Sequence, residues 1–118
     1  MFKNLKVLEL SSVLAGPAVG MFFSELGAQV VKVENKTTNG DVTRKWKLPN
    51  EKKSNLSAYF CSVNYNKNYV FLDFNNHKDR AELEVLIKNC DIVITNFKWK
   101  DAAKFSLEFE DCKKITDY

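Results

Sequence analysis

The 118-residue sequence has few of the residues from which metal centres and disulfide frameworks are built. It contains three cysteines, Cys61, Cys90 and Cys112, and a single histidine, His77. The cysteines are odd in number and form no CxxC pair, so we expect free thiols in a reducing compartment. Three separated thiols and one imidazole also lack the spacing of a zinc site, so we expect no bound metal.

Long apolar runs and an excess of one charge are missing as well. No stretch approaches the roughly 20 apolar residues of a membrane helix, and the segment after Met1 lacks the pattern of a secretory signal. We therefore expect a cytoplasmic protein with no membrane contact. The 18 basic and 15 acidic residues leave a net charge of +3 and are spread along the chain. That distribution argues against nucleic-acid binding but leaves room for a phosphate-bearing small molecule.

With 45% apolar residues, the chain is rich enough in hydrophobic side chains to fold as one domain around a core. Residues 5–10 and 29–34 have the short, apolar and β-branched character of strands. Between them, residues 15–17 (Ala-Gly-Pro) favour the start of a helix, and Gly27 favours its end. The spacing predicts a buried helix stripe made of Val19, Phe22, Phe23 and Leu26.

The same order of elements returns later in the chain. Residues 69–74 and 91–95 are typical of strands, and Asn76 with Asp79 predicts a capped helix between them. The apolar stripe of that helix would be Leu83, Leu86, Ile87 and Cys90. Two strand–helix–strand units with right-handed crossovers predict a Rossmann-like α/β fold, an open parallel sheet with helices on both faces. Residues 35–68 would be a long, polar connection, and residues 99–118 a short helix followed by a polar end.

The turn at residues 11–17 is the best candidate for a binding site on physical grounds. In parallel sheets, free amides and the positive end of a helix dipole meet at such a turn and favour anions. The turn has only Gly16, with Gly20 further on, and matches neither GxGxxG nor GxxxxGK[ST]. A tight helix entry that binds nothing remains an alternative.

Other reactive side chains form no specific constellation. Glu34 and Asp41 flank a loop and are candidates for a pair of carboxylates, but loop acids of this kind usually face solvent. His77 is expected to be exposed in the first turn of a helix. Cys90 lies on an apolar stripe, which favours a core thiol over a nucleophile.

The order of several motifs resembles the start of the family III coenzyme A transferases, a group that includes formyl-CoA transferase and α-methylacyl-CoA racemase. The matching segments are residues 7–10, 15–17, 25–34, 40–44, 64–67, 72–73 and 91–97. Together, AGP, LGAxVxKVE, GDxxR and DxxxxNF are specific, and the match runs from about residue 5 to the end of the chain. The resemblance implies that residues 1–118 form the amino-terminal, incomplete part of the Rossmann-like domain that binds coenzyme A.

The resemblance also implies a set of ligand-binding positions. Carried over by position, the contacts to coenzyme A or acyl-CoA would be Leu14, Ala15, Asn35, Leu72, Asp73, Phe74, Asn75, Asn96, Phe97, Lys98 and Lys104. Asn35 would approach the adenosine end, and Lys104 would place positive charge near the phosphates. These positions follow the carboxyl ends of the predicted strands, where α/β proteins bind ligands.

Some positions depart from the pattern of the family. Relatives often have a basic residue or proline where Asn35 stands, and commonly basic residues at the positions of Asn68 and Asn75. They usually have glycine where this chain has Lys100 and Ser106. Fewer charges near the diphosphate would weaken binding, and the missing glycines would change the shape of the loop.

The resemblance further implies an activity that this chain lacks by itself. In the family an aspartate attacks the acyl-CoA to give a mixed anhydride and then an aspartyl-CoA thioester, and no aspartate here has the matching context. We therefore expect a truncated acyl-CoA:carboxylate CoA-transferase without its catalytic Asp. Family members form interlocked dimers, so we expect a homodimer or association with the missing carboxyl-terminal part.

Two alternatives remain open. The chain could be a fragment of an acyl-CoA racemase, whose acid and base would also lie elsewhere. It could instead be a non-catalytic interaction or assembly subunit, which an open sheet edge or an apolar face would favour.

Overall fold

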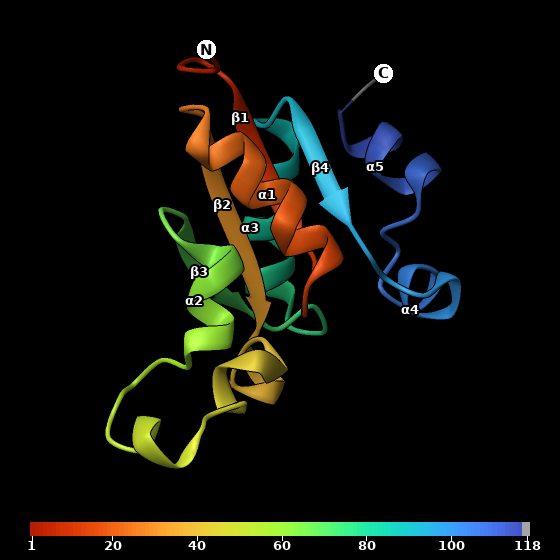
Figure 1. The fold of residues 1–118 in the computed structure, drawn as a ribbon. Coiled ribbons are helices and arrows are strands. Elements are labelled where there is room, and N and C mark those ends of the chain that lie inside the picture. Colours follow the sequence, from red (N-terminus) through yellow and green to blue (C-terminus); the bar gives the residue numbers. More distant parts are fainter. Residues whose placement is uncertain (117–118) are drawn as a thin grey trace.

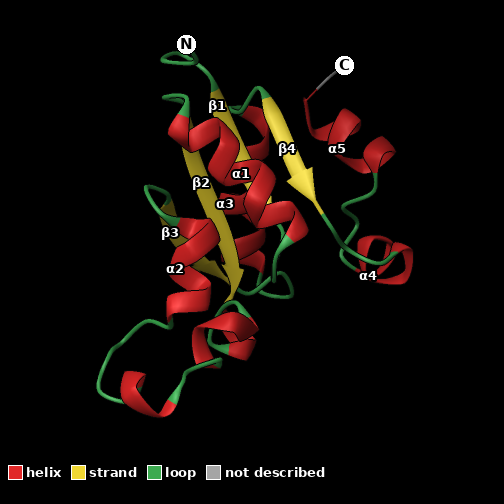
Figure 2. Ribbon diagram, in the orientation of Figure 1, coloured by secondary structure: helices red, strands yellow, loops and turns green. Residues whose placement is uncertain are grey.

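A computed structural model describes residues 1–116, over which four strands alternate with helices (Figures 1 and 2). The first half comprises β1 (Lys6–Leu10), α1 (Ala15–Glu25), β2 (Gln29–Asn35), three 3₁₀ turns η1 (Lys36–Thr38), η2 (Val42–Lys45) and η3 (Pro49–Glu51), and α2 (Ala58–Asn64). The second half comprises β3 (Asn68–Leu72), α3 (His77–Lys88), β4 (Ile92–Thr95), α4 (Trp99–Lys104) and α5 (Phe109–Thr116). None of these helices is long and apolar enough to cross a lipid bilayer.

The four strands form one parallel sheet in the order β3-β2-β1-β4. Leu8 in β1 is in register with Val31 in β2 and with Val93 in β4. The strand order reverses between β1 and β4, because the chain builds outward through β2 and β3 and then returns. This reversal is the topological switch point at which doubly wound proteins bind ligands. The predicted Rossmann-like parallel sheet is confirmed.

Helices cover both faces of the sheet. Figure 1 shows α1 and α2 in front of it and α3 behind it. The rear face holds the larger core, in which Leu8, Leu10 and Val33 pack with Leu83 and Ile87 of α3. The front face has a smaller apolar cluster made of Val7, Ala28, Val30 and Ile94. The front cluster is smaller because charged side chains occupy the rest of that face.

Helix α1 buries a different side from the one predicted. Its buried residues are Gly16, Pro17, Gly20 and Ser24, while Val19 and Phe22 are 46% and 54% exposed. The prediction of a buried stripe through Val19 and Phe22 is therefore wrong. The helix lies so close to the sheet that a Cβ atom at Gly20 would overlap the carboxylate of Glu9. Small residues face the sheet for that reason, Val19 and Phe22 point outward, and Phe23 is half-buried against the front cluster.

Residues 35–68 contain more structure than the predicted extended connection. They fold into η1, η2, η3 and α2 before β3 begins at Asn68. The side chain of Ser57 caps α2 by accepting a hydrogen bond from the N–H of Phe60 at 3.0 Å. Phe60 is fully buried and anchors the helix against the sheet. The sequence pattern missed α2 because a seven-residue helix offers too few periodic positions.

The helix ends follow the predicted signals closely. Gly27 has φ +95°, a left-handed conformation that ends α1. Asn76 caps α3 by accepting from the N–H groups of Lys78 and Asp79 at 3.0 and 3.2 Å. On α3, Leu83 and Ile87 are buried as predicted, with Leu86 and Cys90 half-buried beside them.

Candidate functional site

A cleft of about 390 Å³ lies at the carboxyl ends of the strands, beside the switch point. Its walls come from the ends of β1 and β2, from the loop between residues 35 and 45, and from three phenylalanines. Ligand pockets commonly have volumes of roughly 300–1,000 Å³, so the cleft is large enough for part of a nucleotide-sized ligand.

Phe74, Phe97 and Phe105 form the apolar wall of this cleft. The ring centroids of Phe74 and Phe105 are 5.2 Å apart, and those of Phe97 and Phe105 are 6.0 Å apart. Each ring follows a different element, namely β3, β4 and α4, so the contact ties three segments together. Flat, partly exposed rings at a strand end can stack against a purine or pack against an alkyl chain. Phe74 and Phe97 were predicted for the site, and Phe105 was not.

The polar side of the cleft contains Asn35 and Lys45. Asn35 ends β2 and accepts hydrogen bonds from the N–H and hydroxyl groups of Thr37 at 2.9 and 2.7 Å. Lys45 is exposed and makes no ion pair with any residue in the described part of the chain. Sequence reasoning did not select Lys45, yet it is the one lysine in the wall of the cleft over residues 1–116. Lys45 lines the same cleft as Asn35, a position at which the family resemblance predicts a basic residue or proline.

The first βα turn closes the cleft at the switch point. Asn96 bridges β4 and β1, because its side chain accepts from the N–H of Ser12 at 3.1 Å and donates to the carbonyl of Ser12 at 2.7 Å. Leu14 is the N-cap of α1 and supplies no side-chain hydrogen bond. In the first helical turn the N–H groups of Ala15 and Gly16 have no acceptors within the helix, and Pro17 carries no N–H. Both Leu14 and Ala15 are exposed and available to a ligand.

Leu14, Ala15 and Asn96 are not among the residues that line the cleft, and the other predicted residues, apart from Asn35, Phe74 and Phe97, lie outside its walls as well. Leu72 is 2% exposed and belongs to the core, so its side chain cannot touch a ligand in the cleft. Asp73 and Asn75 form a turn in which the Asp73 carboxylate accepts from the N–H of Asn75 at 3.0 Å. Lys98 is the exposed N-cap of α4. Lys104, also exposed, ends that helix with its Nζ 5.5 Å from the ring centroid of Phe105.

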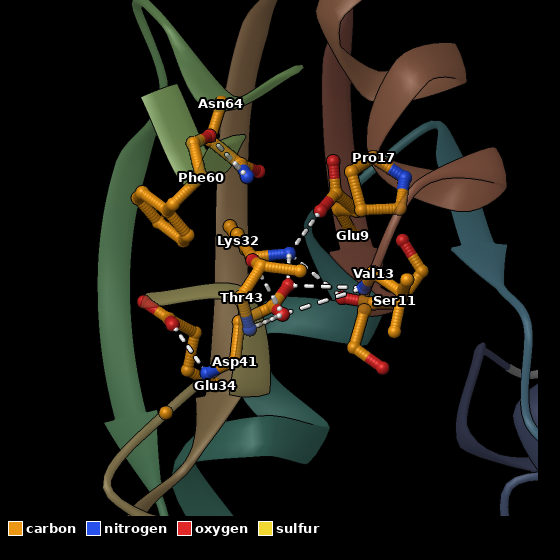
Figure 3. Close-up of polar contacts among 12 residues, drawn as sticks. Glu9, Ser11, Val13, Pro17, Lys32, Glu34, Asp41, Thr43, Phe60 and Asn64 are labelled. Carbon is orange, nitrogen blue, oxygen red and sulfur yellow. Dashed lines mark hydrogen bonds and ion pairs between the residues drawn. The ribbon is translucent and has the colours of Figure 1, made fainter. Parts of the chain in front are cut away.

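A buried network of four charged side chains lies behind the first βα turn, between the sheet and α1. In Figure 3, Lys32 stands between Glu9 and Asp41, with Nζ–oxygen distances of 2.8 and 3.1 Å. Lys67 completes the set with its Nζ 2.5 Å from the other oxygen of Glu9. It also donates to the carbonyl of Pro17 at 2.8 Å. Two cations and two carboxylates therefore balance one another away from solvent.

The network is a feature that sequence reasoning missed. Glu9 and Lys32 are both 0% exposed, and each has an apolar residue on either side of it in its strand. A charged residue in the middle of a buried parallel strand needs a partner of opposite charge, and that signal was present in the sequence.

Glu34 and Asp41 are also buried, which overturns the expectation that they face solvent. They are 3% and 5% exposed, and each has its own cation. Arg44 binds both oxygens of Glu34, at 2.7 and 2.6 Å, and its guanidinium lies 4.0 Å from the centroid of the Phe60 ring. The two acids are joined only through the Asp41 N–H, which donates to Glu34 at 2.8 Å. They are structural anchors of the loop and not a catalytic pair.

Burial and hydrogen bonding shift the pKa values of several of these groups. Burial raises the pKa of the Asp41 carboxyl, but hydrogen bonds from Thr43 and the charge of Lys32 outweigh it and leave a lowered pKa. Burial lowers the pKa of Lys67, opposed by its hydrogen bond to Glu9. At Arg44, the hydrogen bond to Glu34 raises the pKa. Asp41 and Arg44 are thus held in their charged forms.

The other reactive side chains have the roles predicted for them. Cys90 is half-buried against the rear core, and burial raises the pKa of its thiol. His77 is exposed in the first turn of α3.

Known proteins of similar sequence and structure agree on one family. Residues 2–117 match CoA-transferase family III. The chain belongs to this family. The predicted resemblance is confirmed.

Individual members of the family show how much of a whole protein the chain spans. It is 37% identical over 116 residues to the succinate–glutarate CoA-transferase of Agrobacterium fabrum, covering 95% of this chain and 29% of that protein. It is 34% identical over 114 residues to the formyl-CoA:oxalate CoA-transferase of Afipia carboxidovorans, covering 95% and 26%. The crystal structure of a CAIB/BAIF family protein from Brucella suis matches with a TM-score of 0.83 and 37% identity, covering 96% and 30%. The chain thus spans less than a third of these family members.

Proposed function

We propose that residues 1–118 form the amino-terminal part of the coenzyme A-binding domain of an acyl-CoA:carboxylate CoA-transferase. The observation that carries this proposal is the cleft at the switch point, with three phenylalanines on one side and Lys45 on the other. Coenzyme A combines a purine with anionic phosphates, so an aromatic wall facing a free cation suits its chemistry. The uncapped first turn of α1 adds N–H donors at the same end of the sheet.

We further propose that the nucleophilic carboxylate of the transferase is not among these residues. A nucleophile needs a carboxylate oxygen that faces the ligand without a structural partner. Of the acids in the wall of the cleft, Glu34 is occupied on both oxygens by Arg44, and Asp41 by Thr43, Val13 and Lys32. The role of this segment is then to bind coenzyme A and to orient its thioester toward residues supplied from elsewhere.

Association of the chain with a second copy, or with the missing carboxyl-terminal part, stays a prediction. Helix α1 presents the apolar side chains of Val19 and Phe22 outward, 46% and 54% exposed. An exposed apolar face of this kind suits contact with further parts of a transferase or with a second copy of the chain.

The direct test is to titrate coenzyme A into ¹⁵N-labelled protein and follow the amide signals. We expect weak binding, on the order of 0.1–1 mM, with shifts at Ala15, Asn96 and Phe97. Lys45→Ala should weaken binding roughly 3–10-fold, because it removes a charge from the cleft wall. Lys36→Ala, an exposed lysine on η1 outside the cleft wall, is the matched control and should change little.

Two outcomes would contradict the proposal. Amide signals that do not move at millimolar coenzyme A would remove the binding role. Acyl exchange catalysed by the chain itself, measured with succinyl-CoA and carboxylate acceptors, would show that a nucleophile is present after all.

A further inference from the structure

The backbone of the first βα turn is held in an unusual conformation. Val13 has φ +70°, in the left-handed region that glycine occupies readily and β-branched residues almost never do. Such a conformation persists only where surrounding contacts enforce it, and it is often found at functional sites. Val13 lies one residue before the N-cap of α1, so its conformation sets the path of the chain into the helix.

The contact that enforces it comes from Asp41, 28 residues away in the sequence. The N–H of Val13 donates to both carboxylate oxygens of Asp41, at 3.4 and 3.2 Å (Figure 3). Asp41 is itself fixed by the N–H and the hydroxyl of Thr43, at 3.0 and 2.8 Å, and by Lys32 at 3.1 Å. Its carboxylate is 1% exposed, so water does not compete for these bonds.

The charge of Asp41 therefore has a use beyond stabilising its own loop. Thr43 donates to one carboxylate oxygen and Lys32 to the other, while the Val13 N–H is shared between the two. An asparagine at this position would replace one of these oxygens with an N–H₂ group. With the amide oxygen toward Thr43, the N–H₂ group would face Lys32 and the shorter of the two Val13 contacts.

We propose that Asp41 is a positioning residue of the coenzyme A site, which holds Val13 in its left-handed conformation and so fixes the backbone at Leu14 and Ala15 for the ligand. This inference rests on the proposed function of the cleft. The inference gives the GDxxR segment, residues 40–44, a role at the first βα turn, residues 11–17, although the two are far apart in the sequence. Lys32 contributes by keeping the Asp41 carboxylate in place.

The test compares five variants in coenzyme A titration, of which Val13→Gly alone serves as the reference for Val13→Pro. Asp41→Asn should raise the Kd at least fivefold. Glycine adopts φ +70° without help, so adding Val13→Gly to Asp41→Asn should restore the Kd to within about twofold of wild type. Lys67→Met disturbs the far end of the same network and should lower stability while leaving the Kd within about twofold. Val13→Pro, which fixes φ near −65° and removes the N–H, should match the loss seen in Asp41→Asn.

Amide hydrogen exchange separates this inference from the proposed function. The Val13 amide should exchange faster in Asp41→Asn than in Lys67→Met, whether or not coenzyme A binds. Wild-type protein without coenzyme A shifts would refute the proposed function, while unchanged Val13 exchange in Asp41→Asn would refute the role of Asp41. A double variant that binds no better than Asp41→Asn would refute it too. If Asp41→Asn does not fold, Val13→Pro and Val13→Gly decide, because equal Kd values for those two would overturn the inference.

Discussion

Replacing Lys32 with methionine tests the buried network directly, because methionine keeps an unbranched apolar stem but removes the charge and its N–H donors. In the wild type, Lys32 Nζ contacts Glu9 at 2.8 Å, Asp41 at 3.1 Å and the carbonyl of Ser11 at 2.8 Å. After the substitution, Glu9 keeps Lys67 at 2.5 Å, but Asp41 has lost its cation. The damage is therefore expected to fall on Asp41.

Removing one partner of a buried ion pair costs about 3–5 kcal/mol, because the remaining charge is left buried without compensation. The free energy of unfolding of a protein domain is roughly 0.05–0.15 kcal/mol per residue, which gives about 6–18 kcal/mol for a chain of this length. We expect Lys32→Met to remove a large part of that stability. Urea unfolding followed by circular dichroism measures it, provided that each variant unfolds in a single transition.

Lys36→Met is the control, since Lys36 is an exposed lysine on η1 and its loss should change the free energy of unfolding by no more than about 0.5 kcal/mol. A free energy of unfolding for Lys32→Met within about 1 kcal/mol of the wild-type value would refute the reasoning. It would mean that Glu9 and Asp41 are compensated by other groups or reached by water.

Two further predictions address the same region. Gly20→Ala should destabilise the protein by about 1–3 kcal/mol in urea unfolding, because the new Cβ would overlap the Glu9 carboxylate and lie 3.1 Å from Lys67 Nζ. At an open helical site the same substitution would instead stabilise the protein by about 0.5–1 kcal/mol, so a rise in stability would contradict this packing. Ala18→Gly in the same helix measures the difference in helix propensity between alanine and glycine. Despite the opposing effect of burial, hydrogen bonds from Thr43 and the charge of Lys32 lower the pKa of Asp41, so its stabilising contribution is fully present above the pKa of an unfolded aspartate and is lost as the pH falls through the folded-state pKa. Acid titration of the free energy of unfolding should be flatter for Asp41→Asn, and equal slopes for the two proteins below pH 4 would disprove the assignment.

The sequence was sufficient for the elements that follow local rules. Strands at residues 6–10 and 29–35, the end of α1 at Gly27 and the Asn76 cap of α3 all have short-range causes, namely β-branched composition, a positive φ and a side-chain acceptor. Right-handed crossovers then determine on which face of the parallel sheet each connecting helix lies. The fold class could be predicted for these reasons.

The buried face of α1 could not be predicted from its periodicity. The spacing of Val19 and Phe22 is that of a helix with an apolar contact surface, but the contact surface is on the other side. The close approach to Glu9 and Lys67, which decides the matter, involves strand and loop residues up to 58 positions apart. Glu34 and Asp41 were misjudged for the same reason, because their cations Arg44 and Lys32 lie on different elements.

The candidate site was predicted in part. Asn35, Phe74 and Phe97 line the cleft, and Asn96 bridges β1 and β4 at its edge. Lys45 and Phe105 were missed, because the loop and the helix that bring them to the strand ends have no periodic signal. The positions at Lys98 and Lys104 stay predictions that only a ligand can test.

The motifs that carried the family resemblance describe the packing of this segment more than its contacts with a ligand. Gly16 of the AGP motif allows α1 to approach Ser11, and Lys32 of KVE and Asp41 of GDxxR meet in the buried network. Arg44, the last residue of GDxxR, closes the bond to Glu34. A sequence can therefore keep every one of these motifs, fold as this one does, and still differ in the residues that face the cleft. Differences between sequences that share these motifs must then be sought in the cleft walls, at positions such as Asn35 and Lys45, and not in the motifs that identify the family.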